Sequence, residues 1–92
     1  MIVVHVRYLG KIADIAGKKE ETLRLSGTSL KDLIGLLVET YGERMKNILL
    51  DADGKLSENI IILVNHRPIG GNINTKLNNS SRISILPFVS GG

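Results

Sequence analysis

The chain is predicted to fold as one α+β domain, in which a mixed sheet packs on a single main helix. Three observations favour this class. The segments with strand or helix character follow the order β-β-α-β-β-β, and only one of them carries a long amphipathic stripe. With 92 residues and neither linker nor repeat, the chain suits one domain, residues 1–92. Its 42% hydrophobic content and net charge of +3 exclude a disordered segment.

The first part of the chain predicts a strand, a short helix and a second strand. Residues 2–8 alternate, so His5 and Arg7 fall on the face opposite the larger apolar side chains. Residues 10–17 place apolar side chains at helical spacing between two glycines, which predicts one or two helical turns. Residues 20–25 alternate again and predict a strand that pairs with the first.

The main helix is predicted to begin after Ser29. Asp32 follows three residues later and completes a capping box. One apolar stripe then recurs at helical spacing: Leu30, Leu33, Ile34, Leu37, Val38 and Tyr41. Gly42 is predicted to end the helix in the left-handed conformation. Gly35 costs about 1 kcal/mol relative to Ala inside a helix, so we interpret it as a position of close packing.

The segment after the helix leaves one choice open. Residues 43–50 fit either a short helix or an extended connection, and residues 51–54 predict a turn. Residues 60–64 are apolar on both faces, which indicates a central strand or a strand with a buried partner surface. A tight turn at residues 65–66 then leads to a short edge strand containing Pro68. Residues 82–87 predict the last strand.

Two apolar residues of the predicted central strand define a candidate docking surface. Ile61 and Leu63 lie opposite the face that carries Ile60, Ile62 and Val64. We expect them to form an exposed apolar patch on the sheet face away from the helix, where partner proteins dock. The alternative is burial under residues 43–50.

Composition excludes several kinds of site. Without cysteine the chain has no disulfide, no thiolate metal site and no cysteine nucleophile, and we predict no metal site of another kind. His5 and His66 have no carboxylate near them in sequence and are interpreted as solvated or structural. The chain contains no block of five like charges, so its charge pattern does not indicate nucleic-acid binding. It also contains no apolar run long enough for a membrane span. We therefore expect a cytoplasmic protein.

The most distinctive feature is the segment of residues 88–92, predicted to be a flexible Gly-Gly tail. Gly91 and Gly92 lack Cβ atoms and could pass through a narrow channel, leaving the α-carboxylate of Gly92 as the reactive group. Phe88 and Val89 at the root of the tail would anchor it in a partner's groove. The alternative interpretation is a frayed end without function.

Four segments resemble the ubiquitin-like β-grasp sulfur carriers of the MoaD/ThiS family, and most closely the MoaD-type small subunit of molybdopterin synthase. They are residues 8–17, 29–34, 63–68 and 86–92. His66 stands where the family usually has Gly, and Phe88 where it commonly has a second proline. The resemblance implies a β-grasp fold with a four- to five-stranded mixed sheet. Carriers of the thiamine pathway share the tail but tend to be shorter.

The resemblance also implies a chemistry. An E1-like adenylyltransferase (MoeB/ThiF-like) would use ATP to adenylate Gly92, and a sulfur donor would convert it to a thiocarboxylate. The large subunit of molybdopterin synthase (MoaE-like) would receive that sulfur for molybdopterin. Phe88, Val89 and Ser90 would steer the tail. The chain would then be a subunit rather than a stand-alone enzyme and would bind no cofactor itself. The alternatives are a ubiquitin-like modifier joined through Gly92 to lysines, a sulfur carrier for tRNA thiolation, and a non-enzymatic interaction module with an inert tail.

Overall fold

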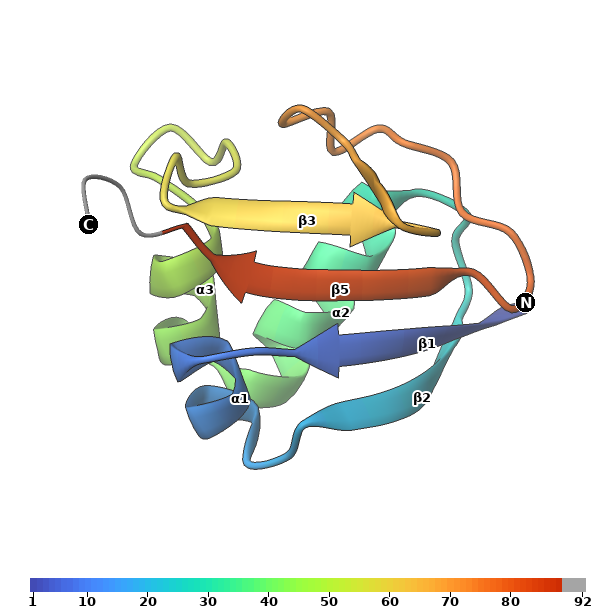
Figure 1. Cartoon of the computed structure of the whole chain (residues 1–92), viewed down its shortest axis with the longest axis horizontal. Coiled ribbons are helices and arrows are strands. Elements are labelled where there is room, and N and C mark those ends of the chain that lie inside the picture. The colour runs from blue at the N-terminus through green and yellow to red at the C-terminus, as the bar shows by residue number, and fades with distance from the viewer. Residues whose placement is uncertain (89–92) are drawn as a thin grey trace.

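The computed structural model describes residues 1–88, which form a five-stranded mixed sheet and three helices (Figure 1). The elements are β1 (Ile2–Tyr8), α1 (Lys11–Ala16), β2 (Glu20–Leu25), α2 (Leu30–Tyr41), α3 (Glu43–Leu49), β3 (Ile60–Val64), β4 (Arg67–Pro68) and β5 (Arg82–Pro87). The strands lie in the order β2-β1-β5-β3-β4. The predicted α+β class is confirmed, and along the chain the strands occur where the sequence predicts them.

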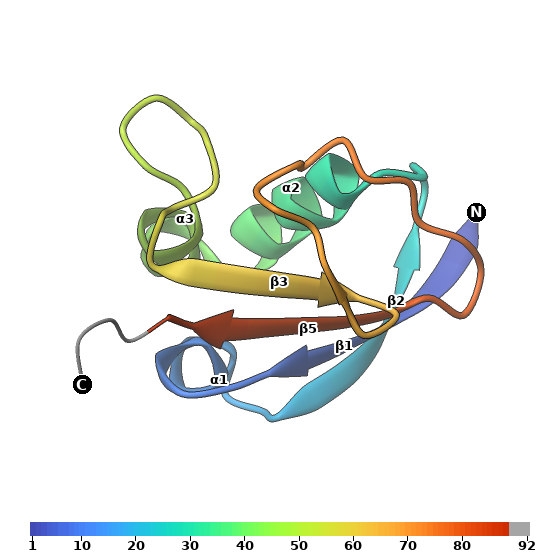
Figure 2. The same ribbon diagram turned by 45° about the horizontal axis from the view of Figure 1, so that its top comes forward.

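Strand β5 lies in the middle of the sheet. Its pairing with β1 is parallel, the only parallel pairing in the sheet formed by residues 1–88. In that pairing Val6 lies opposite Ile83 and Tyr8 opposite Ile85. Strands β2, β3 and β4 pair antiparallel with their neighbours. Because alternate side chains point to opposite faces, the buried positions of these strands all lie on the side where the helices gather (Figures 1 and 2). We call this side the covered face and the other side the open face.

Helix α2 supplies the main apolar surface over the covered face. Its buried residues Leu30, Leu33, Ile34 and Leu37 belong to the predicted stripe. The capping box is present: the Ser29 hydroxyl accepts from the Asp32 N–H at 3.2 Å, and the Asp32 carboxylate accepts from the Ser29 N–H at 3.1 Å. The predicted helix start is therefore confirmed.

Two expectations about glycines in this region are wrong. Gly42 has φ 82° and ψ −158°, so it lies outside the left-handed helical region and instead turns the chain sharply from α2 into α3. Gly35 is exposed, and a Cβ built on it would meet nothing within 4 Å. It therefore does not serve close packing, and the helix tolerates it because the burial of the opposite stripe outweighs its low helix propensity.

The open choice for residues 43–50 is resolved as a helix. Helix α3 buries Met45 and Leu49 in the same core as α1 and α2. The adjoining turn is confirmed, since the Asp51 carboxylate accepts from the backbone N–H groups of Asp53 and Lys55 at 2.9 and 3.0 Å.

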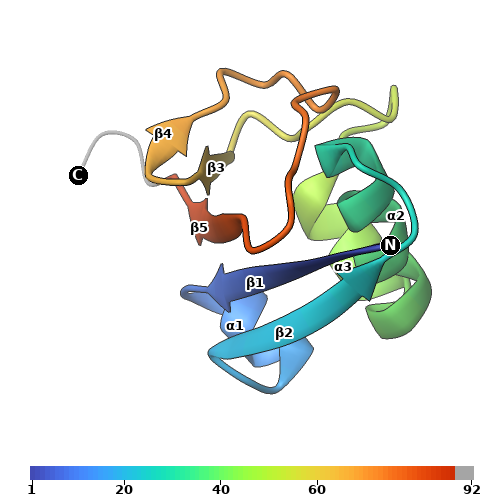
Figure 3. The same cartoon turned by 90° about the vertical axis from the view of Figure 1, so that its right-hand side faces the viewer.

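The long connection before β5 completes the N-terminal end of α2 (Figure 3). The N–H groups of Leu30 and Lys31 have no partner within the helix and donate to the carbonyls of Thr75 and Ile73, at 2.9 and 2.7 Å. Leu77 is fully buried and adds to the core. The connection is thus a loop that is bonded to the helix.

The carboxylate of Glu21 lies at the β2 side of the covered face, where it binds polar groups of β1 and α2. The hydroxyls of Tyr8 and Tyr41 both donate to Glu21, and Lys18 lies 3.6 Å from the same carboxylate. Burial acts to raise the pKa of Glu21, but the hydrogen bonds from the two tyrosines and the charge of Lys18 lower it overall. Burial, together with the hydrogen bond to Glu21, raises the pKa of Tyr41 to about 12. This group joins β1, β2 and α2.

Within residues 1–88, none of the helices has both the length and the apolar character needed to cross a bilayer.

Candidate functional site

The first part of the candidate site is the end of β5, from which residues 89–92 continue. The Phe88 N–H donates to the Asn59 carbonyl at 2.7 Å, so the chain stays paired with the start of β3 one residue beyond the strand. On the other side, a Cβ on Gly10 would lie 2.9 Å from Cγ of Pro87, which means that only a glycine allows this contact. The point at which the final segment leaves the sheet is therefore fixed from both sides.

Apolar side chains remain exposed beside this point. Phe88 is 48% exposed and Leu9 is 39% exposed, and both are large hydrophobic residues at the same end of the sheet. Exposed aromatic and aliphatic side chains at the edge of a fixed backbone are suited to bind a partner's groove. The other predicted tail residues, Val89, Ser90, Gly91 and Gly92, lie outside the described residues.

The second part of the candidate site is the open face. Ile61 pairs with Leu86 of β5, and Leu63 lies between Ser84 and Pro68. Ile61 and Leu63 alternate with the buried residues of β3 and do not belong to the core cluster. They therefore face away from the helices as predicted, although each is half-buried rather than fully exposed.

The alternative burial of these two residues under residues 43–50 is wrong. Helix α3 packs Met45 and Leu49 into the core, on the covered face. It therefore lies on the other side of the sheet from Ile61 and Leu63. Their role in docking remains a prediction.

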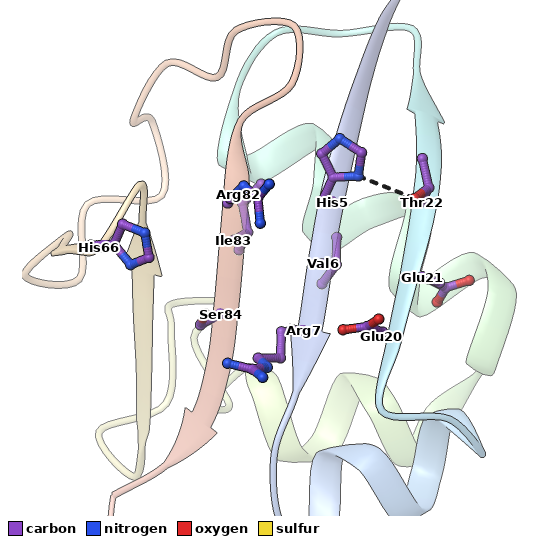
Figure 4. A pocket seen from close by; sticks show the side chains of 10 residues that line it. All are labelled: His5, Val6, Arg7, Glu20, Glu21, Thr22, His66, Arg82, Ile83 and Ser84. Carbon is purple, nitrogen blue, oxygen red and sulfur yellow. Dashed lines mark hydrogen bonds between the residues drawn. The ribbon is translucent and has the colours of Figure 1, made fainter.

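The open face also contains a polar hollow of about 460 Å³ that the sequence did not indicate (Figure 4). It is lined by the open-face residues His5, Arg7, Glu20, Thr22, Arg82 and Ser84, by His66, and by Val6, Glu21 and Ile83, which lie between them along the strands and whose side chains belong to the covered face. The His5 ring shares a hydrogen bond of 3.1 Å with the Thr22 hydroxyl. The two arginines come from the adjacent parallel strands β1 and β5, far apart in sequence.

A short turn completes this hollow. Asn65 and His66 both have positive φ, 50° and 73°, as a tight two-residue hairpin turn requires. The Asn65 N–H donates to the Arg82 carbonyl at 2.7 Å, and the Asn65 side chain accepts from the Arg82 N–H at 2.9 Å. These bonds hold the turn against the start of β5 and bring His66 to the rim of the hollow.

The groups with shifted pKa values serve the fold rather than either part of the site. They are Tyr8, Glu21 and Tyr41 on the covered face and Asp32 in the helix cap, where hydrogen bonds from Ser29 lower the pKa of the Asp32 carboxyl. In the described part of the chain, no three His, Asp or Glu side chains gather as metal ligands would. The geometry thus offers surfaces for binding and an anchored chain end.

Comparisons with known proteins agree with this architecture. The model of the ThiS family matches residues 6–92. No curated protein sequence gives a significant match.

Several solved structures share the fold. The solution structure of small archaeal modifier protein 1 from Methanosarcina acetivorans is 31% identical, with a TM-score of 0.80, and the match covers 100% of this chain and 98% of that one. Urm1 from Trypanosoma brucei is 25% identical, with a TM-score of 0.79 and coverage of 98% and 95%. A putative molybdopterin converting factor, subunit 1, from Pyrococcus furiosus is 24% identical, with a TM-score of 0.77 and coverage of 97% and 100%.

Proposed function

The chain belongs to the ThiS family of ubiquitin-fold sulfur carriers, and we propose that it carries sulfur on Gly92 for molybdopterin biosynthesis. The observation that carries this proposal is the fixed end of β5. Pro87 contacts Gly10, and the Phe88 N–H is bonded to Asn59, so the domain holds the root of the segment that a partner would take up. The predicted tail of residues 88–92 then acts as the carrier arm.

The proposed chemistry takes place on the carboxylate of Gly92 in two steps, in the cytoplasm. An E1-like adenylyltransferase joins the carboxylate oxygen to the α-phosphorus of ATP and releases pyrophosphate. A donor then supplies sulfur at the oxidation level of sulfide. This sulfur attacks the carbonyl carbon, the bond to AMP breaks, and a thiocarboxylate and a proton are formed. A large subunit of the MoaE type would accept this sulfur.

The chain's own residues would position the tail rather than perform acid–base work. Phe88 is exposed at the root and is available to a partner's apolar groove. Leu9 lies at the same end of the sheet and extends that apolar surface. In this proposal ATP is consumed by the activating partner, and the chain binds no cofactor of its own.

The experiment is co-expression with an adenylyltransferase of the MoeB/ThiF type and a sulfur donor, followed by intact-mass analysis. The expected product is heavier by the difference between one sulfur and one oxygen atom. The matched control is a variant that ends at Ser90, which keeps the whole described domain. An unchanged mass with an active partner, or restoration of cofactor synthesis by the shortened variant, would overturn the proposal.

A second candidate function is protein modification, favoured by the 31% identity to a small archaeal modifier protein. The same adenylate would then be attacked by a lysine amine, and an isopeptide bond would replace the bond to AMP. Cell extracts would contain higher-mass adducts with a Gly-Gly remnant on target lysines. Sulfur transfer for tRNA thiolation is a further alternative, and loss of thiolated tRNA in a deletion strain would identify it.

A further inference from the structure

The open face carries an uncompensated positive charge. Alternate positions of β1, β2 and β5 place Arg7, Arg24 and Arg82 on this face, with Glu20 as the only acidic residue, so three positive charges minus one leave an excess of two. Strands lie about 4.8 Å apart, and alternate residues along a strand lie about 6.6 Å apart, so Arg7 and Arg82 are diagonal neighbours.

The arginine side chains at the hollow have no partner within the described chain. The ion pair between Lys18 and Glu21 is the only one among residues 1–88. No side-chain hydrogen bond reaches the guanidinium group of Arg7 or Arg82 in the same residues. Glu20 lies opposite Arg7 in the strand register but is not within ion-pair distance. Two guanidinium groups are thus available to carboxylates at one hollow.

Apolar side chains continue this surface on the side of β3. The strand register places Ser84 between Arg7 and Leu63, so a single cross-strand row runs from a cation to an apolar residue. The next outward-facing pair, Leu86 and Ile61, extends the apolar part toward Phe88. A ligand that covers the face must therefore offer both negative charge and apolar side chains.

We propose that the open face binds an acidic segment of a partner protein. The segment's carboxylates pair with Arg7 and Arg82, and its apolar side chains cover Leu63 and Leu86. A nucleic acid is disfavoured because neither Phe, Tyr nor Trp lines the hollow, and because a phosphate backbone would leave the apolar side chains of Leu63 and Leu86 uncovered. The inference is separate from the chemistry proposed at Gly92.

The test uses the isotope-labelled full chain and a fluorescent peptide of repeated Glu-Glu-Leu. We expect amide shifts on titration at Arg7, Leu63 and Arg82, and weaker binding as the ionic strength rises. The R7E/R82E double variant should bind roughly tenfold more weakly. The matched control R44E/K46E reverses two exposed charges on α3 and should stay within about twofold of the wild type. If R7E/R82E does not fold, R7Q/R82Q replaces it.

Several outcomes would overturn the inference. If a peptide with Lys in place of Glu binds equally well, the carboxylates do not pair with the arginines. If a peptide with Ser in place of Leu binds equally well, the apolar side chains do not contribute to binding. Equal affinity of R7E/R82E and R44E/K46E would show that the peptide binds elsewhere. Binding of oligouridylate to the face in place of the peptide would identify an RNA surface. The variant that ends at Ser90 should bind the peptide like the full chain. Weaker binding by this variant would show that the peptide binds the tail rather than the open face.

Discussion

The two faces of the sheet are built from the same strands but differ in whether their charged groups have partners. On the covered face, the polar groups at the side of β2 are bonded to one another, with Glu21 accepting from Tyr8 and Tyr41. On the open face, Arg7 and Arg82 have no side-chain partner within residues 1–88. The alternation of strand residues thus separates the groups that hold the fold from the groups available for binding.

This difference implies that substitutions on the two faces should have different consequences. Changes on the covered face should alter the free energy of unfolding and leave peptide binding unchanged. Changes on the open face should do the reverse. Adjacent residues such as Glu20 and Glu21, which belong to different faces, provide matched pairs for this comparison.

The largest effect is expected for a core leucine. Leu37 of α2 is fully buried, so Leu37→Ala should lower the free energy of unfolding by about 2–5 kcal/mol through lost burial and a cavity. Leu63→Ala on the open face makes the same chemical change and should cost about 1 kcal/mol or less. Urea unfolding followed by circular dichroism measures both. Equal losses would show that Leu63 belongs to the core.

The next effect separates the adjacent glutamates. Glu21→Gln replaces the carboxylate that accepts from two tyrosines and should cost about 1–3 kcal/mol. Glu20→Gln should stay within about 0.5 kcal/mol, because Glu20 is exposed and outside ion-pair distance of any cation in the described chain. A cost for Glu20→Gln as large as that for Glu21→Gln would contradict the division between the faces.

Glu21 and Tyr41, which are bonded to each other, should make the free energy of unfolding depend on pH in both acidic and alkaline solution. The pKa of Glu21 is lowered in the fold, so its contribution is present above the ordinary value of 4.5 and is lost as the pH falls through the folded pKa. The pKa of Tyr41 is raised to about 12, so its contribution is present below pH 10.0 and is lost as the pH rises toward 12. Thermal unfolding of wild type and Glu21→Gln should show a weaker acid dependence for the variant. Parallel acid limbs would contradict this role of Glu21.

The sequence predicted the features that depend on neighbouring residues. Helix α2 carries its cap, its stripe and its end within residues 29–42, so local chemistry was sufficient to place it. For residues 43–50 the sequence leaves the choice open, because no capping side chain or glycine marks the end of α3 at Leu50 and because its burial depends on packing against α1 and α2.

The candidate site was predicted only in part, for the same reason. Alternation along β3 was enough to place Ile61 and Leu63 on the open face. The pairing of β1 with β5, which brings Arg7 near Arg82, joins segments more than seventy positions apart in the chain. Glu21 reaches both tyrosines only after the β1–β2 register and the packing of α2 are set. Non-local contacts of this kind leave no periodic signal in a sequence.

The smallest effect concerns a position on neither face of the sheet. Gly35 is exposed within α2 and has space for a Cβ, so Gly35→Ala should raise the free energy of unfolding by about 0.5–1 kcal/mol. Gly10→Ala is the contrasting variant and should be destabilising, because Gly10 has φ +58° and its Cβ would lie 2.9 Å from Pro87. Chemical denaturation should resolve both signs. Since Gly35 lies away from the open face, its substitution should leave binding of the acidic peptide unchanged. A loss of stability in Gly35→Ala would mean that helix propensity does not govern this position.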